Sequence, residues 1–158
     1  VGIGLTADAY HLTASDPEGT GAKNAMQLAI NEAGIALEQV DYINTHGTST
    51  PIGDVAEVKA IQDVFGKHAY HINLTSSKSM TGHILGGTGA VEAIISILSM
   101  QHGIVTPTIN HEEGDEDPNI DYKLNFTFNQ AQQREIRYAM SNNFGFGGHN
   151  ACLLFKRI

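Results

Sequence analysis

The segment that most restricts the fold is a predicted helix over residues 89–101, because apolar side chains point in almost every direction around its axis. Its apolar residues are Val91, Ala93, Ile94, Ile95, Ile97, Leu98 and Met100. Glu92 is the only charged residue in it. A helix that is apolar all round is buried on all sides, and a single domain of 158 residues has few places to bury one so completely. We therefore expect a further layer of protein to cover this helix.

Two other features favour a chain that is part of a longer protein. Charged residues make up 16% of the sequence, which is below the roughly 25% that is typical of a soluble domain. So few charges indicate that more of the surface is buried than one small domain would bury alone. The chain also opens on "VGIGL", without a methionine, and this segment has the pattern of the middle of a strand.

Strands and helices alternate along the rest of the chain. Strands are expected at residues 1–7, 40–44, 71–76, 134–143 and 151–158, and helices at residues 22–33, 51–65 and 89–101. This order predicts one α/β domain over residues 1–158 with a mixed sheet. The early strands are joined by parallel crossovers, and the last two form an antiparallel pair.

The predicted helix over residues 51–65 has clear start and stop signals. Thr50 offers a hydroxyl cap before the proline of the first turn, and Gly66 ends the helix. Asp54 and Glu57 lie near its beginning, where we expect their negative charges to stabilise the positive end of the helix dipole.

Composition excludes several classes of function. The formal net charge is −8 and no cluster of Lys and Arg is present, which argues against a nucleic-acid-binding protein. No signal peptide is visible, and no apolar run approaches the ~20 residues of a membrane span. The single cysteine, Cys152, cannot form an internal disulfide, which favours a reducing, cytoplasmic setting. Its apolar neighbours indicate a small buried side chain.

Several segments resemble common catalytic or metal-binding motifs, but none of them matches such a motif in full. His68 and His71 have a possible metal spacing, but no carboxylate or thiol ligand is near them in sequence, and we expect no metal site. The "GTSTP" around Ser49 departs from the nucleophile elbow G-x-S-x-G. The "GGTGA" before the apolar helix resembles a phosphate-binding loop, but it lacks the G-K-[ST] that should follow. It is better explained by close packing of the helix N-terminus.

Two of the eight histidines stand out by position. His46 follows the end of the predicted strand at residues 40–44, and His83 follows the strand at residues 71–76. Ligands of α/β sheets bind outside the carboxyl ends of strands, and consecutive crossover units place such loops at the same edge. The two imidazoles are therefore expected to converge, although each alone is equally well explained as a loop histidine bonded to the backbone.

Phe144 and Phe146 are separated by glycines between the last two predicted strands. One interpretation is a turn with two aromatic side chains anchored in the core. The other is a mobile aromatic gate, since glycines absorb changes of backbone conformation. The spacing alone favours the turn.

Four motifs occur along the chain in this order: "NTHGTSTPIGD", "SSKSMTGHILGGTGAVE", "PTIN" and "NNFGFGGHNA". Together they resemble the C-terminal half of the β-ketoacyl-[acyl-carrier-protein] synthases, specifically the type II elongating condensing enzymes. The resemblance covers essentially the whole chain. It implies a thiolase-like layered fold in which the apolar helix packs against its counterpart from an N-terminal half. That half, which carries the nucleophilic cysteine of the family, is not in this sequence.

The resemblance also implies a reaction, the decarboxylative Claisen condensation of malonyl-acyl carrier protein with an acyl-enzyme. His46 and His83 match the two histidines that hold the enolate oxygen. Lys78 matches a lysine that pairs with Glu92 and orients His83. The resemblance also assigns roles to residues of the glycine-rich turn between the last two strands and of the "THGTST" loop. These are Phe144, the gating residue whose N–H also helps to form the acyl oxyanion hole, and the substrate-binding Thr48, Thr50 and Phe146.

No cofactor is implied, since the substrates arrive on the phosphopantetheine arm of acyl carrier protein. The implied partners are acyl carrier protein, the N-terminal half and a second copy in a homodimer. Two alternatives stay open. The first is a chain-length or partner subunit of a polyketide system, which binds rather than catalyses. The second is a ketosynthase domain of a multidomain polyketide synthase. Retention of both histidines and the Lys78–Glu92 pair argues against the first.

Overall fold

The computed structural model describes residues 1–158, and it contains the predicted alternation of strands and helices. The main helices are α1 (Thr20–Ala33), α2 (Pro51–Phe65), α3 (Lys78–Thr81) and α4 (Thr88–His102). Short 3₁₀ turns are η1 (Leu37–Gln39), η2 (Gly66–His71) and η3 (Leu85–Gly87). The strands are β1 (Gly2–Ala7), β2 (Tyr42–Asn44), β3 (Asn73–Thr75), β4 (Ile104–Val105), β5 (Gln132–Gln133), β6 (Tyr138–Gly145) and β7 (His149–Lys156). None of the helices combines the length and the apolar character that crossing a membrane requires.

The main sheet is mixed, as predicted, with the strand order β1-β7-β6-β2-β3. β2 runs parallel to both β3 and β6, whereas β6–β7 and β7–β1 are antiparallel pairs. The last two strands start and end elsewhere than predicted. The β6–β7 ladder extends to the pair Gly145–His149. At its other end β6 begins at Tyr138, and Arg134, which was predicted to start this strand, hydrogen-bonds to the carbonyl of His71 and to Asn73.

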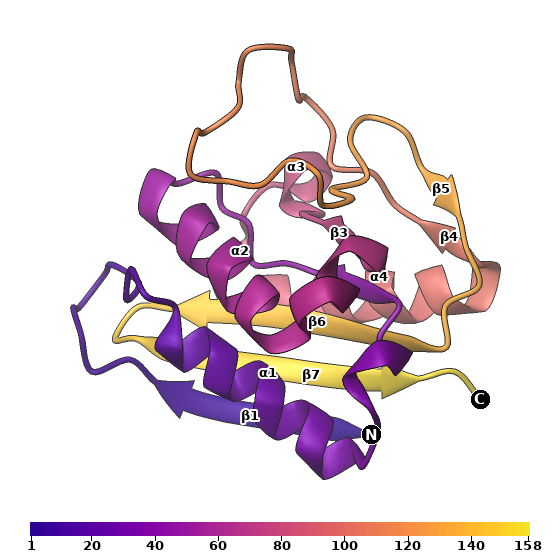
Figure 1. Ribbon diagram of the computed structural model, residues 1–158, viewed down its shortest axis with the longest axis horizontal. Coiled ribbons are helices and arrows are strands. Elements are labelled where there is room, and N and C mark those ends of the chain that lie inside the picture. Colours follow the sequence, from indigo (N-terminus) through magenta and orange to yellow (C-terminus); the bar gives the residue numbers. More distant parts are fainter.

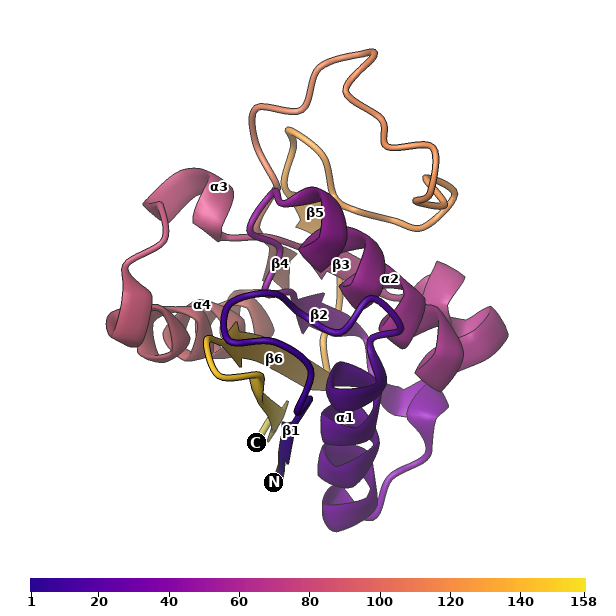
Figure 2. The same cartoon turned by 90° about the vertical axis from the view of Figure 1, so that its left-hand side faces the viewer.

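Helices cover both faces of this sheet, with α1 and α2 on one face and α4 on the other (Figures 1 and 2). The larger core lies between α1, α2 and the sheet, and includes Met26, Ile61 and Met140. The glycines of "VGIGL" let α1 approach β1 closely. A Cβ on Gly4 would lie 1.8 Å from the carbonyl oxygen of Ala25, so no larger residue fits there.

α4 packs on the sheet through one side only, and this chain does not itself supply the further layer of protein that we expected to cover the helix. Glu92, Ser96 and Ser99 face the protein and are buried. Ile94 and Leu98 on the other side are 56% and 45% exposed. Ile3 and Leu5 of β1, which alternate with the glycines that face α1, are exposed as well. The α4 side of the molecule therefore carries a large apolar surface.

Candidate active site

The two histidines singled out in the sequence converge. His46 lies in the loop after β2, and His83 lies between α3 and η3. Their ring centroids are 5.7 Å apart and the rings are nearly perpendicular, at 86°. The crossover argument from the sequence is confirmed. The parallel pairing of β2 with β3 brings both loops to the same edge of the sheet.

The ring of His46 is oriented by the backbone of Phe144, whose N–H donates to Nδ1 at 3.3 Å. The ring centroids of His46 and Phe144 lie 5.5 Å apart. Because Nδ1 accepts a hydrogen bond, the proton of the neutral imidazole sits on Nε2. The N–H of Phe144, which the resemblance assigns to an acyl oxyanion hole, is therefore engaged by His46 in this structure.

The backbone around His46 is held by Glu57 of α2, which the sequence analysis did not identify as a site residue. Its two carboxylate oxygens accept the N–H groups of His46 and Gly47, both at 2.9 Å, and Oε1 also accepts Asn142 Nδ2 at 3.1 Å. Glu57 is buried, so it does not act at the helix end as we expected. A signal for this was present in the sequence, since Glu57 shares the apolar stripe of α2 with Ile61.

Burial raises the pKa of Glu57 to about 7, against the hydrogen bonds from the backbone of Gly47 and His46 and from Asn142, which lower it. The pKa of His46 moves the other way, to about 3, chiefly through burial and then through electrostatic interaction with Lys78 and His83. Near neutral pH, His46 is thus an uncharged donor at Nε2.

This electrostatic setting gives a prediction for His46 that spectroscopy can test. In the protein that carries this chain, ¹⁵N-histidine NMR should show His46 as the Nε2–H tautomer, with no titration between pH 7 and pH 5. Since an unfolded histidine takes up a proton near pH 6.5 and folded His46 does so only near 3, this residue makes folding less favourable as the pH falls below about 6.5. Loss of one signal in His46→Ala assigns the resonance. A titration midpoint between pH 6 and 7 would contradict the prediction.

His83 is held by residues that follow it, not by Lys78 as the resemblance implied. The N–H of Leu85 donates to His83 Nδ1 at 3.1 Å, and Thr88 Oγ1 lies 3.1 Å from the same nitrogen. Leu85 adopts φ 53°, a left-handed conformation that is costly for a bulky residue. In this conformation the N–H of Leu85 donates to the imidazole of His83. As in His46, the ring proton of neutral His83 is therefore on Nε2.

Lys78 instead bonds Glu92 of the apolar helix, with 2.5 Å between Nζ and Oε1. Both side chains are buried. The predicted partnership of the two residues is confirmed. Burial raises the pKa of Glu92, and the hydrogen bond and charge of Lys78 counteract that shift. The only charged residue of the helix therefore has the cation that its burial requires.

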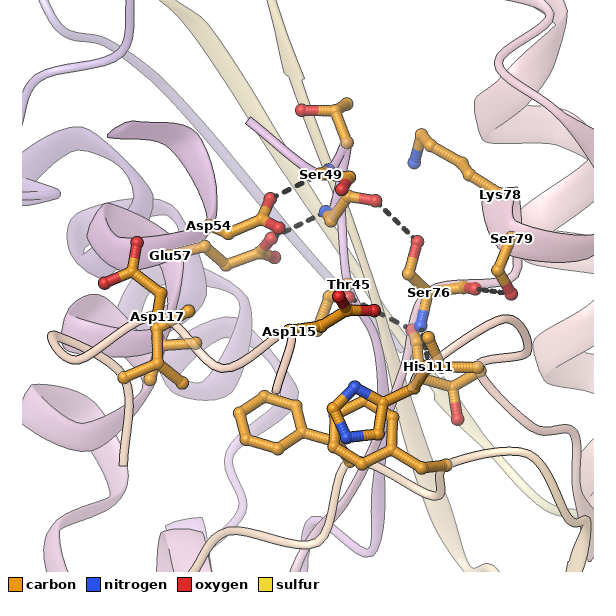
Figure 3. Close-up of a pocket in the computed structure, with 18 of the residues that line it drawn as sticks. Thr45, Ser49, Asp54, Glu57, Ser76, Lys78, Ser79, His111, Asp115 and Asp117 are labelled. Atoms are coloured by element: carbon orange, nitrogen blue, oxygen red, sulfur yellow. Dashed lines mark hydrogen bonds between the residues drawn. The ribbon is translucent and has the colours of Figure 1, made fainter. Parts of the chain in front are cut away.

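A cavity of about 590 Å³ is lined by Thr48, Thr50, Lys78 and His83, but not by His46. Figure 3 shows Asp54 and Glu57 of α2 on one side of it, and Lys78 and Ser79 of α3 on the other. The hydroxyls of Thr48 and Thr50 lie 3.2 Å apart, and Thr50 makes no capping bond to α2. The prediction that the Thr50 hydroxyl caps α2 is therefore wrong. Both threonines instead line the cavity.

The glycine-rich turn places its two phenylalanines differently. Phe144 belongs to β6 and packs partly on the main core beside His46. Phe146 lies at the tip of the hairpin, 74% exposed, and does not line the cavity. The structure therefore brings Phe144 to His46 and leaves Phe146 exposed, and neither phenylalanine lines the cavity.

Cys152 lies inside β7 and is fully buried, as its apolar neighbours indicated. Burial raises the pKa of its thiol, with the charge of Glu57 as a smaller cause. A thiol in this setting stays protonated and is a poor nucleophile.

Comparisons with known proteins agree with this geometry. Residues 1–112 match the family model described as the C-terminal domain of β-ketoacyl synthase. The whole chain is 54% identical to 3-oxoacyl-[acyl-carrier-protein] synthase 2 of Staphylococcus aureus and 48% identical to the synthase of the same name from Coxiella burnetii. In both cases it covers 37% of the relative's length.

Solved structures give the same fold. A β-ketoacyl synthase from Burkholderia phymatum is 39% identical with a TM-score of 0.90, over 100% of this chain and 37% of that one. A ketosynthase of a type II polyketide system, solved with its acyl-carrier protein, is 32% identical with a TM-score of 0.93, over 99% of this chain and 38% of that one. The fold is thus the thiolase-like fold of ketosynthases, and the chain belongs to the β-ketoacyl synthase family, as a match to its C-terminal domain.

Proposed function

We propose that this chain is the C-terminal part of a 3-oxoacyl-[acyl-carrier-protein] synthase that elongates fatty acids by decarboxylative condensation. The observation that carries the proposal is the meeting of two imidazoles, each with Nδ1 occupied and Nε2–H free. Sequence identity of 54% to synthases of that name supports the substrate class. Because the chain spans 37% of the length of those relatives, the remaining part of the enzyme lies outside it.

In the proposed reaction, the carbon–carbon bond to the malonyl carboxylate breaks and CO₂ leaves. The electron pair moves to the thioester oxygen, forming an enolate. Two preorganised N–H donors from His46 and His83 stabilise that charge without the cost of reorienting solvent. The enolate carbon then attacks the acyl thioester on a cysteine, and the cysteine leaves as a thiolate. We assign this cysteine to the N-terminal half, because Cys152 is buried in β7.

The cavity supports a carrier-bound substrate. Thr48 and Thr50 place hydroxyl groups at its wall, and these groups can hydrogen-bond the amides of a phosphopantetheine arm. A related ketosynthase has been solved in complex with its acyl-carrier protein. We propose acyl carrier protein as the partner of this site, with Phe144 as the residue that gates it. A homodimer and a cytoplasmic location belong to the same proposal.

We place the N-terminal half of the synthase on the exposed apolar surface of α4 and β1. Ile94 and Leu98 of α4 and Leu5 of β1 contribute to this surface. An apolar surface of this kind is typical of an interface with another protein layer. The predicted burial of the helix on all sides would then be completed by that half.

The polyketide alternative has structural support too, since a ketosynthase in complex with its chain length factor is 35% identical with a TM-score of 0.84. The arrangement of His46, His83 and the Lys78–Glu92 pair favours a catalytic subunit over a binding subunit.

The test uses the full-length protein, with malonyl-acyl carrier protein labelled in the free carboxylate and an acyl-acyl carrier protein as primer. We expect release of labelled CO₂ and a 3-oxoacyl chain two carbons longer than the primer, detected by mass spectrometry. A chain-length partner would give product only when it is mixed with a separate, active ketosynthase. Neither CO₂ nor product from the full-length protein would overturn the proposal.

A further inference from the structure

We propose that Ser76 is a positioning residue that fixes the separation of the two active-site histidines. This inference rests on the proposed function, because it concerns how the two imidazoles come to share one oxygen atom. Ser76 makes no hydrogen bond to either ring. It joins the loop that carries His46 to the segment that carries Lys78 and His83.

The contacts of Ser76 begin where the parallel strands β2 and β3 end. The last backbone bond between them runs from the N–H of Thr45 to the carbonyl of Thr75, at 2.8 Å. One residue later, the N–H of Ser76 donates to Thr108 Oγ1 at 2.9 Å and is no longer available to the β2 side. The hydroxyl of Ser76 instead makes the link to the loop after β2, because it donates to the carbonyl of Gly47 at 2.6 Å.

Gly47 leaves no free space at this contact. Its φ is +37°, and a Cβ there would lie 2.7 Å from the Cβ of Ser76. The N–H of Gly47 is bonded by Glu57 and its carbonyl by Ser76. The residue directly after His46 is thus held from α2 on one side and from the second histidine loop on the other.

Ser76 also anchors the start of the segment that leads to His83. Its carbonyl accepts the N–H and the hydroxyl of Ser79, at 3.2 and 2.8 Å. Ser79 Oγ in turn accepts the N–H of Ile109 at 3.0 Å. Figure 3 shows Ser76 between the loop after β2 and Ser79 of α3. A shift of Ser76 would therefore move α3, with Lys78, relative to His46.

Removing the hydroxyl should loosen this joint without unfolding the protein. Ser76→Ala leaves the carbonyl of Gly47 without its donor, which is a small loss among the other bonds that hold the loop. Misplacement of a catalytic group by ~1 Å can cost ~10²-fold in rate. We expect Ser76→Ala in the full-length enzyme to lower kcat for malonyl decarboxylation by about 10- to 100-fold, with little change of KM or Tm.

The matched control is Thr81→Val, which removes a hydroxyl from α3, the short helix that follows Ser76. Thr81 Oγ1 bonds only the carbonyls of Ser77 and Gly82, within its own turn. We expect this variant to keep the wild-type rate. Ser76→Thr retains the hydroxyl and should recover most of the activity that Ser76→Ala loses. Transfer of the acyl group to the cysteine, which in the proposed reaction does not pass through the enolate that the two histidines stabilise, should stay near the wild-type rate in all three variants.

A double-mutant cycle separates positioning from general stability. If Ser76 acts by placing His46 against His83, Ser76→Ala should add little further loss in a His46→Ala background. A multiplicative effect in that background, or a wild-type rate for Ser76→Ala, would overturn the inference. A wild-type enzyme that does not decarboxylate malonyl-acyl carrier protein would instead contradict the proposed function, so the two failures are distinguishable.

Discussion

His46→Ala and His83→Ala should each lower the rate of malonyl decarboxylation by ~10²–10³ in the full-length enzyme, the cost typical of losing one preorganised donor to a developing oxyanion. Each ring has its Nδ1 occupied by a backbone N–H, so only Nε2–H is free to donate. Each substitution therefore removes one of the two donors. The measurement is release of labelled CO₂ from malonyl-acyl carrier protein under saturating conditions.

A suitable control is His71→Ala, which removes an exposed imidazole from η2, away from the cavity. It should leave the rate unchanged. Acylation of the enzyme by an acyl donor should persist in both active-site variants, since it uses the cysteine of the other half. Normal decarboxylation in either histidine variant would remove the role that we assign to that residue.

Lys78→Met should lower the free energy of unfolding by about 3–5 kcal/mol, as expected when one partner of a buried ion pair is removed. Glu92 would then be a buried carboxylate without its cation, and its pKa, already raised by burial, would rise further. A raised pKa in the folded state favours folding at low pH and opposes it as the pH rises above about 4.5. The loss should thus be larger at pH 8 than at pH 4, as measured by chemical denaturation.

Two further variants separate charge from packing. Lys78→Met combined with Glu92→Leu removes both charges and should recover most of the stability at pH 8, but not the activity. Lys23→Met breaks an exposed pair with Asp63, at 3.4 Å, and should cost less than about 1 kcal/mol. Equal losses for Lys78→Met at both pH values would show that packing, rather than the charge of Glu92, dominates.

The order of strands and helices and the meeting of His46 with His83 could be predicted from the sequence. Periodicity and turn residues are local properties, and the right-handed crossover rule then places successive loops at one sheet edge. The pairing of Lys78 with Glu92 followed from the family resemblance, and a lone charge in an apolar helix agreed with it.

The sequence alone did not identify the residues that hold the site in place. Glu57, Ser76 and Thr88 act through hydrogen bonds to the backbone or the ring of residues elsewhere in the chain. Any residue supplies an N–H or a carbonyl, so such contacts leave no pattern of residue types that sequence analysis can detect. Phe146 was grouped with the site by its motif, but the geometry of the hairpin turned it away.

By itself, the sequence determined the main strands and helices, though not the short α3, β4 and β5, and which end of the sheet carries the two imidazoles, because hydrophobic period and chain connectivity are written in consecutive residues. Only the tertiary structure decided the protonated nitrogen of each ring, the depressed pKa of His46 and the partially covered face of α4. Those properties depend on burial and on distances between segments that are far apart in the chain, and such distances exist only once the layers have packed.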